Sequence, residues 1–396
     1  MPIKGNRQQA GILAPGRARV LLISPIEPSS TGNGLAMRAA AIQQGLGNCA
    51  VHVVPLAGGP SPDLNGDELA RSWLKHERGR DLLTRVPELP DRARLGAPAL
   101  GEEALNSLGN QSFEHVYLLR SYAAGCVLPL RRAWPEARFT LDVDEDDAAV
   151  AREIADLVAD PAQRAHWVRE SERYAAFLTV VSEWFDDLVA SSPTEAKKLG
   201  GLLRREVHCV VNRPHVLSTD AQLKGIRQGI LFVGNLDYCP NRDALERLLG
   251  RILPLLHKRH PRLALDVVGK GAADLAARFS EVAEVRWHGY VEDLQPFYAR
   301  AAMALVPLRA GGGSRIKLLE AMALGLPIVS TAKAAEGLEV ADGEHLLLAE
   351  TDSALADAAD RLLRDPDFAA TLARHAAELV RRRYSPAEVY DQLGRL

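Results

Sequence analysis

The residues best suited to chemistry lie in one stretch, 307–331, where a glycine run precedes a charged helical pattern. The glycines at 311–313 let a backbone approach a ligand closely. Ser314 is a good N-cap, and Gly325 followed by Pro327 predicts the end of the helix. A helix that begins beside a glycine loop presents free backbone N–H groups and the positive end of its dipole. The stretch therefore predicts an anion-binding site.

The charged side chains of the same helix favour a diphosphate as that anion. Arg315 and Lys317 lie in the first turn, where the helix dipole disfavours each cation by ~0.3–1 kcal/mol. A bound diphosphate would neutralise both, and Glu320 could then accept hydrogen bonds from ribose hydroxyls. The alternative is an (i, i+3) ion pair between Lys317 and Glu320, worth ~0.2–0.5 kcal/mol. Because that pair does not account for the glycines, we favour the ligand.

The block from Gly311 to Ser330 resembles the donor-site signature of retaining family-4 glycosyltransferases of the GT-B fold. It is most similar to the subgroup with a Gly-Gly-Gly-x-Arg-x-Lys loop before a Leu-Glu-Ala helix. The resemblance is dense over 230–384 and thinner before it. It implies transfer of a sugar from a nucleotide diphosphate with retention of configuration, and without a metal. Supporting segments are Phe232 to Leu236, Val267 to Gly271, His288 to Val291 and Glu336 to Leu338.

Two departures from the family pattern concern the same site. Many members place a glutamate eight residues before the position of Glu320, where this sequence has Gly312. Many also place a basic pair after the first strand of the second domain, where only Arg242 is available here. In the subgroup, Arg315 and Lys317 would take over the diphosphate role. The missing glutamate leaves the pose of the transferred sugar open.

Further candidates face the same predicted cleft. Tyr290 and Val291 could form the apolar wall for the nucleotide base, or could simply end a core strand. Gly32 and Gly34 lie between the first strand and the first helix, where they would contact the donor or the acceptor, or form a plain tight turn. Arg38, in that helix, would reach the cleft or lie on the surface.

An acidic run, 141–147, follows a buried strand. Asp142, Asp144 and Asp146 alternate, but the glycine and the terminal glutamate of a calcium loop are missing, so no metal is expected. The run is interpreted as acceptor-facing or solvated, with Asp144 as the candidate catalytic or acceptor-orienting carboxylate. Arg120, at the end of its strand, is a similar candidate.

The elements that must position these residues alternate between strand and helix in both halves of the chain. This order implies parallel sheets joined by right-handed crossovers. With the resemblance, it predicts an α/β protein of the GT-B fold, two Rossmann-like doubly wound domains facing across a cleft. Domains are expected at 1–218 and 230–384, with a linker at 219–229 and a last helix, 385–396, that could pack on the first domain. Strands are expected at 19–24, 51–54, 115–119, 139–143, 179–182, 208–211, 230–233, 263–268, 285–288, 302–306, 328–330 and 345–348.

Composition excludes some other classes of protein. Of the 396 residues, 47% are apolar and 25% charged, as in a packed globular protein. A net charge of −3 provides no long-range field for nucleic acid. The four cysteines form no CxxC pair, and there is no secretion signal and no apolar run of bilayer length. The expected location is the cytoplasm, with a peripheral contact to the inner face of the membrane left open.

These observations predict a glycosyltransferase with a nucleotide-sugar co-substrate, an unidentified acceptor and no other cofactor. Two alternatives stay open. One is a sugar-nucleotide epimerase of similar architecture, and the other is a non-catalytic donor-binding subunit, which the glycine at 312 suggests. The catalytic candidates are Arg315, Lys317 and Asp144. The donor-binding candidates are Gly32, Gly34, Gly234, Asn235, Tyr290, Val291, Gly312, Gly313, Ser314, Arg315, Lys317 and Glu320.

Overall fold

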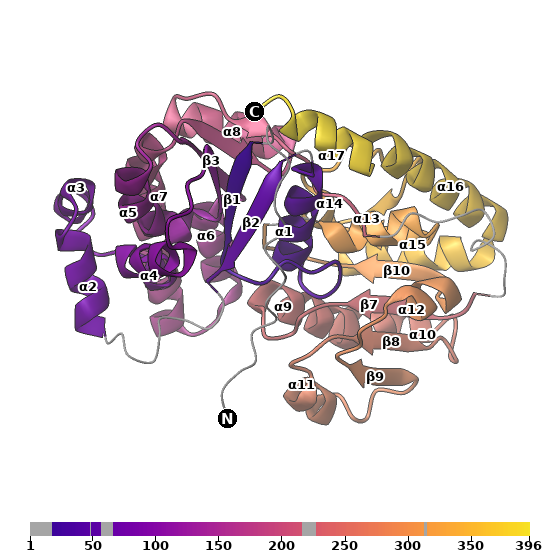
Figure 1. Ribbon diagram of the computed structural model, residues 1–396. Coiled ribbons are helices and arrows are strands. Elements are labelled where there is room, and N and C mark those ends of the chain that lie inside the picture. Colours follow the sequence, from indigo (N-terminus) through magenta and orange to yellow (C-terminus); the bar gives the residue numbers. More distant parts are fainter. Residues whose placement is uncertain (1–17, 48, 57–65, 216–226, 313–314) are drawn as a thin grey trace, which may run out of the picture.

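The computed structural model describes residues 18–47, 49–56, 66–215, 227–312 and 315–396, which form two α/β domains (Figure 1). Gly313, Ser314 and most of the predicted linker, 219–229, lie outside the described residues. Each domain contains a six-stranded sheet, and every described strand pairing in both sheets is parallel. The predicted fold class, two doubly wound α/β domains, is confirmed.

The first domain holds the strands and helices up to residue 209, and its predicted strands match the observed ones closely, with one exception. The elements are β1 Arg19–Ser24, α1 Gly34–Gly45, β2 Ala50–Pro55, α2 Gly66–Leu74, α3 Glu77–Arg85, α4 Pro98–Leu108, β3 His115–Leu119, α5 Val127–Ala133, β4 Arg138–Asp144, α6 Asp147–Leu157, α7 Pro161–Val181, β5 Asp187–Ala190, α8 Pro193–Leu203 and β6 His208–Cys209.

The exception is residues 179–182, for which the prediction of a strand is wrong. Thr179 and Val181 belong to α7, a helix of 21 residues, and Ser182–Trp184 continues it as a 3₁₀ turn. The true strand, β5, follows a few residues later. The β-branched run favours a strand locally, but Phe177 and Val181 face the core from one side of the helix, and that burial outweighs propensity.

Neither α7 nor any other helix within the described ranges is long and apolar enough to cross a membrane.

The second domain holds the remaining strands, and each overlaps its predicted range. The helical stretch from Cys239 to His257 is interrupted by a π-helical segment, Leu248–Ile252, just before Pro254, which has no N–H to continue the regular ladder. The elements are β7 Ile230–Val233, α9 Cys239–Arg247, α10 Leu253–His257, β8 Leu265–Val268, α11 Ala273–Arg278, β9 Val285–Gly289, α12 Gln295–Arg300, β10 Met303–Val306, α13 Ile316–Ala323, β11 Ile328–Ser330, α14 Ala332–Ala335, β12 Leu347–Leu348, α15 Asp352–Arg364, α16 Pro366–Arg383 and α17 Pro386–Leu393.

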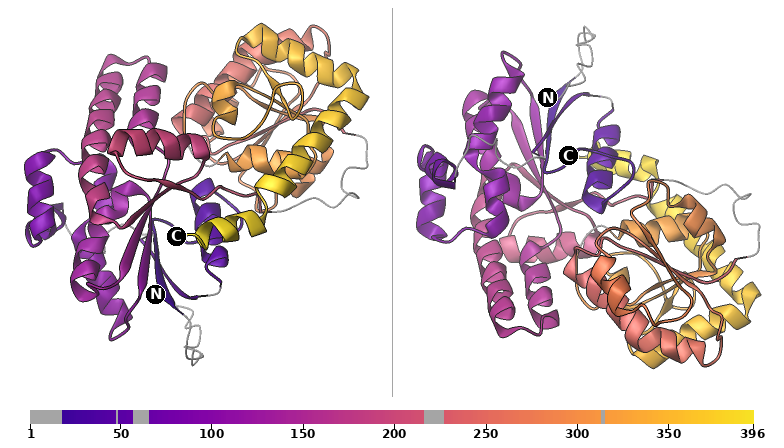
Figure 2. Two further views of the ribbon diagram at one scale, coloured as in Figure 1. Left: turned by 90° about the horizontal axis from the view of Figure 1, so that it is seen from above. Right: turned by 90° about the horizontal axis from the view of Figure 1, so that it is seen from below.

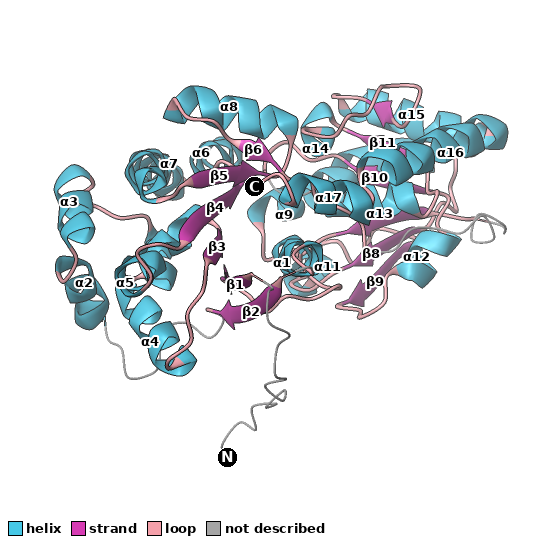
Figure 3. Ribbon diagram, turned by 45° about the horizontal axis from the view of Figure 1, so that its top comes forward, coloured by secondary structure: helices cyan, strands magenta, loops and turns pink. Residues whose placement is uncertain are grey.

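Strand order explains where the fold can bind a ligand. The sheets run β2-β1-β3-β4-β5-β6 and β12-β11-β10-β7-β8-β9, with helices on both faces (Figure 3). In each sheet the connections reverse direction at one place, between β1 and β3 in the first domain and between β7 and β10 in the second. Ligands of open α/β sheets bind beyond the carboxyl ends of the strands at such a switch point. The fold thus predicts a site near residues 25–34, 120, 234 and 307–311.

A buried ion pair lies inside the first domain. The Arg38 guanidinium donates to both oxygens of Asp142, at 2.8 Å from Nη2 to Oδ1 and 3.0 Å from Nε to Oδ2. Its Nη1 donates to the Val210 carbonyl and to Asn212 Oδ1, and Tyr117 Oη donates to Asp142. Arg38 is 1% exposed and Asp142 0%. Arg38 therefore neither reaches the cleft nor lies on the surface, and both interpretations made for it are wrong.

The last helix returns to the first domain. α17 lies against α1 (Figure 2), and a Cβ added at Gly45 would meet Leu393 Cδ1 at 2.3 Å. The side chain of Gln392 accepts a hydrogen bond from the Val211 backbone N–H at 2.8 Å. Just before α17, Tyr384 Oη accepts one from the Glu339 N–H in the second domain. The end of the chain thus connects the second domain to the first through the contacts of α17 with α1 and with Val211.

Candidate functional site

A cleft of about 1170 Å³ opens between the domains at the two switch points. The first domain contributes the loop after β1, with Gly32 and Gly34, and Arg120 at the end of β3. The second contributes Gly234 and Asn235 after β7 and the loop from Leu308 after β10. These are the segments at which the strand order predicts a ligand.

The start of α13 differs from the prediction. Its N-cap is Arg315, with φ of +44°, and the helix proper begins at Ile316, whereas the predicted cap, Ser314, lies outside the described residues. Arg315 makes no side-chain cap hydrogen bond, which leaves the first backbone N–H groups of α13 without that partner. The anion site stays a prediction, at a helix whose first residue is Ile316.

Arg315 lies where the cleft meets a smaller cavity. Its Nη2 donates to the Gly311 carbonyl at 3.0 Å, and its Nε donates to the Glu336 carbonyl at 3.3 Å. Nη2 also lies 3.4 Å from Glu336 Oε2, and the side chain is only 7% exposed. Arg315 lines both cavities. The guanidinium is thus held beside the glycine loop by backbone carbonyls, within reach of either side.

Lys317 is a half-buried lysine of the cleft that has no ion-pair partner within the described residues. It lines the cleft, and within the described residues its Nζ has no hydrogen bond or ion pair. Burial lowers its pKa to about 8, and burial likewise raises the pKa of Glu320 to about 7. Glu320 accepts a hydrogen bond from Tyr298 Oη at 3.3 Å instead of pairing with the lysine. The alternative of an (i, i+3) ion pair is therefore wrong, and a desolvated cation faces the cleft.

The other donor-binding candidates of the second domain also line this cleft. Tyr290 follows β9 and is 62% exposed, so the alternative that it ends a core strand is wrong. Val291 lies beside it in the same wall. Gly234 lines the wall after β7, and its carbonyl oxygen lies so near Gly269, where φ is +145°, that a Cβ added at Gly269 would approach this oxygen to 1.7 Å. This close backbone contact explains the Gly-x-Gly pattern after β8 as a turn that supports the wall.

The candidates of the first domain lie across the cleft. Gly32 has φ of +101°, which favours glycine, and Asn33 caps α1 by accepting from the Ala36 N–H at 2.9 Å. Gly32 and Gly34 both line the cleft. The turn therefore both begins α1 and forms part of the wall of the cleft.

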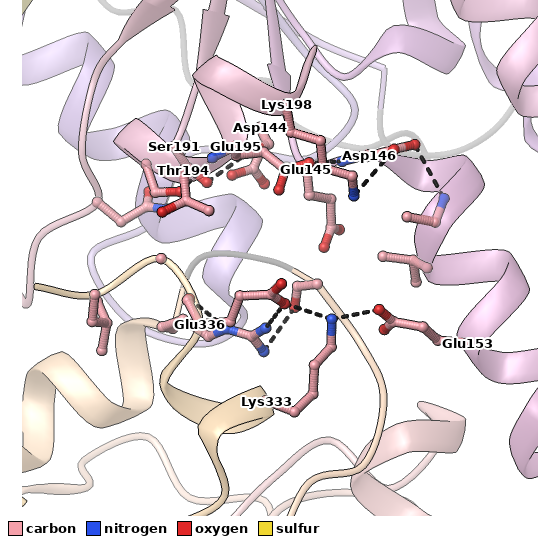
Figure 4. Close-up of a pocket in the computed structure, with 18 of the residues that line it drawn as sticks. Asp144, Glu145, Asp146, Glu153, Ser191, Thr194, Glu195, Lys198, Lys333 and Glu336 are labelled. Carbon is pink, nitrogen blue, oxygen red and sulfur yellow. Dashed lines mark hydrogen bonds and ion pairs between the residues drawn. The ribbon is translucent and has the colours of Figure 1, made fainter. Parts of the chain in front are cut away.

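The acidic run after β4 is buried, so its interpretation as a solvated segment is wrong. Asp144 is 3% exposed, with φ of +63°, and its Oδ2 accepts from Arg120 Nη1 at 3.2 Å. Arg120 also pairs with Glu145 and Asp147. Asp146 caps α6 through the Ala148 and Ala149 N–H groups. Asp144 lines only the smaller cavity, about 40 Å³, and not the large cleft (Figure 4).

Contacts across the domains close this smaller cavity. Glu153, on α6 of the first domain, accepts a hydrogen bond from the Gly311 N–H at 2.9 Å. It also pairs with Lys333 on α14, which in turn pairs with Glu336 (Figure 4). The glycine loop of the second domain is thus tied directly to a helix of the first.

The sequence analysis did not single out three residues that contact the site: Glu145, Glu153 and Tyr298. Glu145 was part of the acidic run but was not separated from its neighbours. The contacts of Glu153 with Gly311 and of Tyr298 with Glu320 join residues 158 and 22 positions apart. No local spacing indicates such pairs, so only the fold reveals them.

The fold and the cleft define the class of protein: a two-domain GT-B architecture with a cation-bearing cleft between the domains. Residues 227–365 match the family described as glycosyl transferases group 1. The second domain is therefore a group 1 glycosyltransferase domain, and the predicted class of enzyme is confirmed at that level.

Two solved structures share this fold, and one curated protein is similar in sequence. One relative, described as an uncharacterized 44.6 kDa protein in the cps region of Klebsiella pneumoniae, is 23% identical over 172 residues, which span 41% of this chain and 44% of that protein. The sucrose-phosphate synthase of Thermosynechococcus elongatus superposes with a TM-score of 0.69 at 18% identity, covering 96% of this chain and 98% of that one. Anabaena HepE, in complex with UDP and glucose, gives 0.65 at 14% identity, covering 96% and 99%.

Proposed function

We propose that the protein transfers a sugar from a nucleoside diphosphate to an acceptor on the first domain, with retention of configuration and without a metal. The observation that carries the proposal is Lys317, a desolvated cation without a partner among the described residues, at the start of a helix that faces the cleft. A buried charge is costly unless something neutralises it. A diphosphate supplies two negative charges at a helix N-terminus that already favours them.

The remaining donor contacts follow from this placement. Departure of the nucleoside diphosphate builds negative charge on the phosphate that leaves, and Lys317 and Arg315 stabilise that charge as it forms. Ionised Glu320 accepts hydrogen bonds from the ribose, and Tyr290 with Val291 covers the base. The acceptor attacks from the side of the departing group, which fits the likeness of the loop to retaining enzymes. Closure of the domains keeps water from the bond that breaks.

A uridine diphosphate hexose is the donor we favour, supported by the complexes of HepE with UDP and glucose and with UDP-glucose. On the acceptor side the cleft is lined by Tyr122, His166, Trp167 and Tyr174. Aromatic side chains of this kind suit the apolar face of a sugar ring. The relative in the cps region also supports a polysaccharide or its precursor as acceptor.

The test is a thermal-shift screen against nucleotide sugars, followed by product analysis. A donor at 100 times its Kd should add about 2.7 kcal/mol of stability. Release of free nucleoside diphosphate together with a glycosylated acceptor supports the proposal. An epimerised but intact sugar nucleotide would instead identify an epimerase. Binding without turnover over a broad acceptor panel would identify a donor-binding subunit.

Donor affinity should depend on pH through two groups with displaced pKa values. Glu320, with a pKa of about 7, is ionised only above that pH, and Lys317, with a pKa of about 8, is charged only below that pH. Calorimetric affinity for a nucleotide sugar, whose diphosphate does not titrate near neutrality, should be highest between about pH 7 and 8. It should fall on the acid side as Glu320 is protonated and on the alkaline side as Lys317 is neutralised. A profile without the alkaline decline in the wild type would contradict the role of Lys317.

A further inference from the structure

The glycine at 312 is explained by the small space beside it, and not by a backbone conformation that favours glycine. Its neighbour Gly311 has φ of +103°, but Gly312 is not among the described residues with positive φ. A Cβ added at Gly312 would lie 2.1 Å from Glu145 Oε2 and 2.7 Å from Val150 Cγ2. A side chain at 312 would therefore have to displace the carboxylate from the other domain that already fills its place.

Glu145 is directed to that place by the backbone that precedes it. β4 ends at Asp144, whose φ of +63° turns the chain so that Glu145 projects across the cleft toward the second domain. Its Oε1 accepts from Arg120 Nη1 at 2.7 Å. Within the described residues its Oε2 is buried and has no hydrogen-bond partner. A carboxylate with a purely structural role would use both oxygens, because an unpaired buried oxygen is costly.

The free oxygen lies at the junction of the two cavities. Four residues line both the cleft and the smaller cavity: Glu145, Val150, Gly312 and Arg315. Arg315 is one of the two cations assigned above to the diphosphate. The group attached to the diphosphate in a nucleotide sugar is the sugar itself, so the space beside Arg315 and Gly312 is where its hydroxyls arrive. A carboxylate oxygen repels phosphate but accepts hydrogen bonds from hydroxyls.

We propose that Glu145 is a specificity-determining residue whose Oε2 accepts hydrogen bonds from hydroxyl groups of the transferred sugar. It supplies from the first domain a carboxylate in the space that Gly312 leaves in the second. This inference rests on the proposed function, since it needs a nucleotide sugar in the cleft. It adds that recognition of the sugar requires a side chain from the first domain in addition to the cations of the second.

The test compares two probes, UDP and the UDP-sugar that stabilises the wild type most, by titration calorimetry. Glu145→Gln keeps the size of the side chain and loses its charge. It should weaken the UDP-sugar by about 10-fold to 100-fold, the range for a lost hydrogen bond to a charged group, and leave UDP within about 2-fold. Gly312→Ala should have the same selective effect, because its Cβ displaces the carboxylate.

A double variant tests the position of the carboxylate and not merely its loss. Glu145→Ala/Gly312→Glu moves the carboxylate from one domain to the other and should recover UDP-sugar affinity relative to Glu145→Ala alone. Gly201→Ala is the matched control, because a Cβ there meets nothing within 4 Å, and it should change neither affinity.

The possible results separate the two proposals. If the wild type binds neither UDP nor any UDP-sugar, the proposed function fails and this inference with it. If the wild type binds a UDP-sugar but Glu145→Gln binds it equally well, only the inference fails. Equal losses of UDP and UDP-sugar in Glu145→Gln would likewise overturn it, because they would mark Glu145 as structural. Melting temperatures of all variants identify any that fold poorly.

Discussion

Replacing Lys317 by methionine should weaken binding of a nucleotide sugar while making the free protein more stable. The lost charge-assisted contact should reduce affinity by about 1.5–3 kcal/mol, or roughly 10-fold to 150-fold. The stability should rise because burial holds the pKa of this lysine at about 8, so the folded state is penalised for its charge at neutral pH. Calorimetric titration measures the first effect and urea unfolding without ligand measures the second.

The opposite signs of these two effects make the result specific. A lysine that served only the fold would lose stability when replaced, and a surface lysine would change nothing. Lys197, which is exposed on α8 and lines neither cavity, is the matched control, and Lys197→Met should leave both quantities unchanged. Wild-type affinity in Lys317→Met would remove the observation on which the proposed function depends.

Replacing Arg38 by methionine should destabilise the first domain by about 3–5 kcal/mol, because it leaves a buried carboxylate without its partner. Asp142 is 0% exposed, and Arg38 is the only described residue that neutralises it by an ion pair. Burial alone would lower the pKa of Arg38, but Asp142 and Asp144 outweigh it and raise the pKa, so the pair stays charged. Urea unfolding, followed by circular dichroism, gives the free energy of unfolding.

A double variant shows whether stability depends on the charges of the Arg38–Asp142 pair or on the volume that the two side chains fill. Arg38→Met/Asp142→Leu removes both charges and should recover much of the loss, since a buried ion pair can often be replaced by apolar side chains. Arg395→Ala removes an exposed pair with Asp391, in which the arginine side chain is 72% exposed, and should cost at most about 1 kcal/mol. A cost of the same small size in Arg38→Met would show that the network contributes little.

The fold could be predicted from local patterns because its strands are short apolar runs in strict alternation with helices. β1, β3, β7 and β11 begin and end at the predicted residues. The strand expected at 179–182 failed because a β-branched run also fits a buried helix face. The packing of α7 on the sheet decides between a strand and a helix, and the residues of the segment alone do not reveal that packing.

The site could be predicted in part, for a similar reason. Residues of one loop and its helix, such as Arg315, Lys317 and Glu320, follow from local spacing, and all three line the cleft. Residues that meet across the two domains do not follow from local spacing. Glu145 lies 167 positions before Gly312 and fills the space beside it. The sequence shows that a side chain is missing at 312, but it does not show which residue takes that space.

The return of α17 to α1 has a consequence for how the protein is made. On the ribosome, the strands and helices of the first domain emerge well before residues 386–393, so the surface around Gly45 stays uncovered until the second domain has been synthesised. A nascent first domain therefore carries an exposed apolar strip that a chaperone could hold. Shortening the chain after Tyr384 would damage the half of the molecule made first.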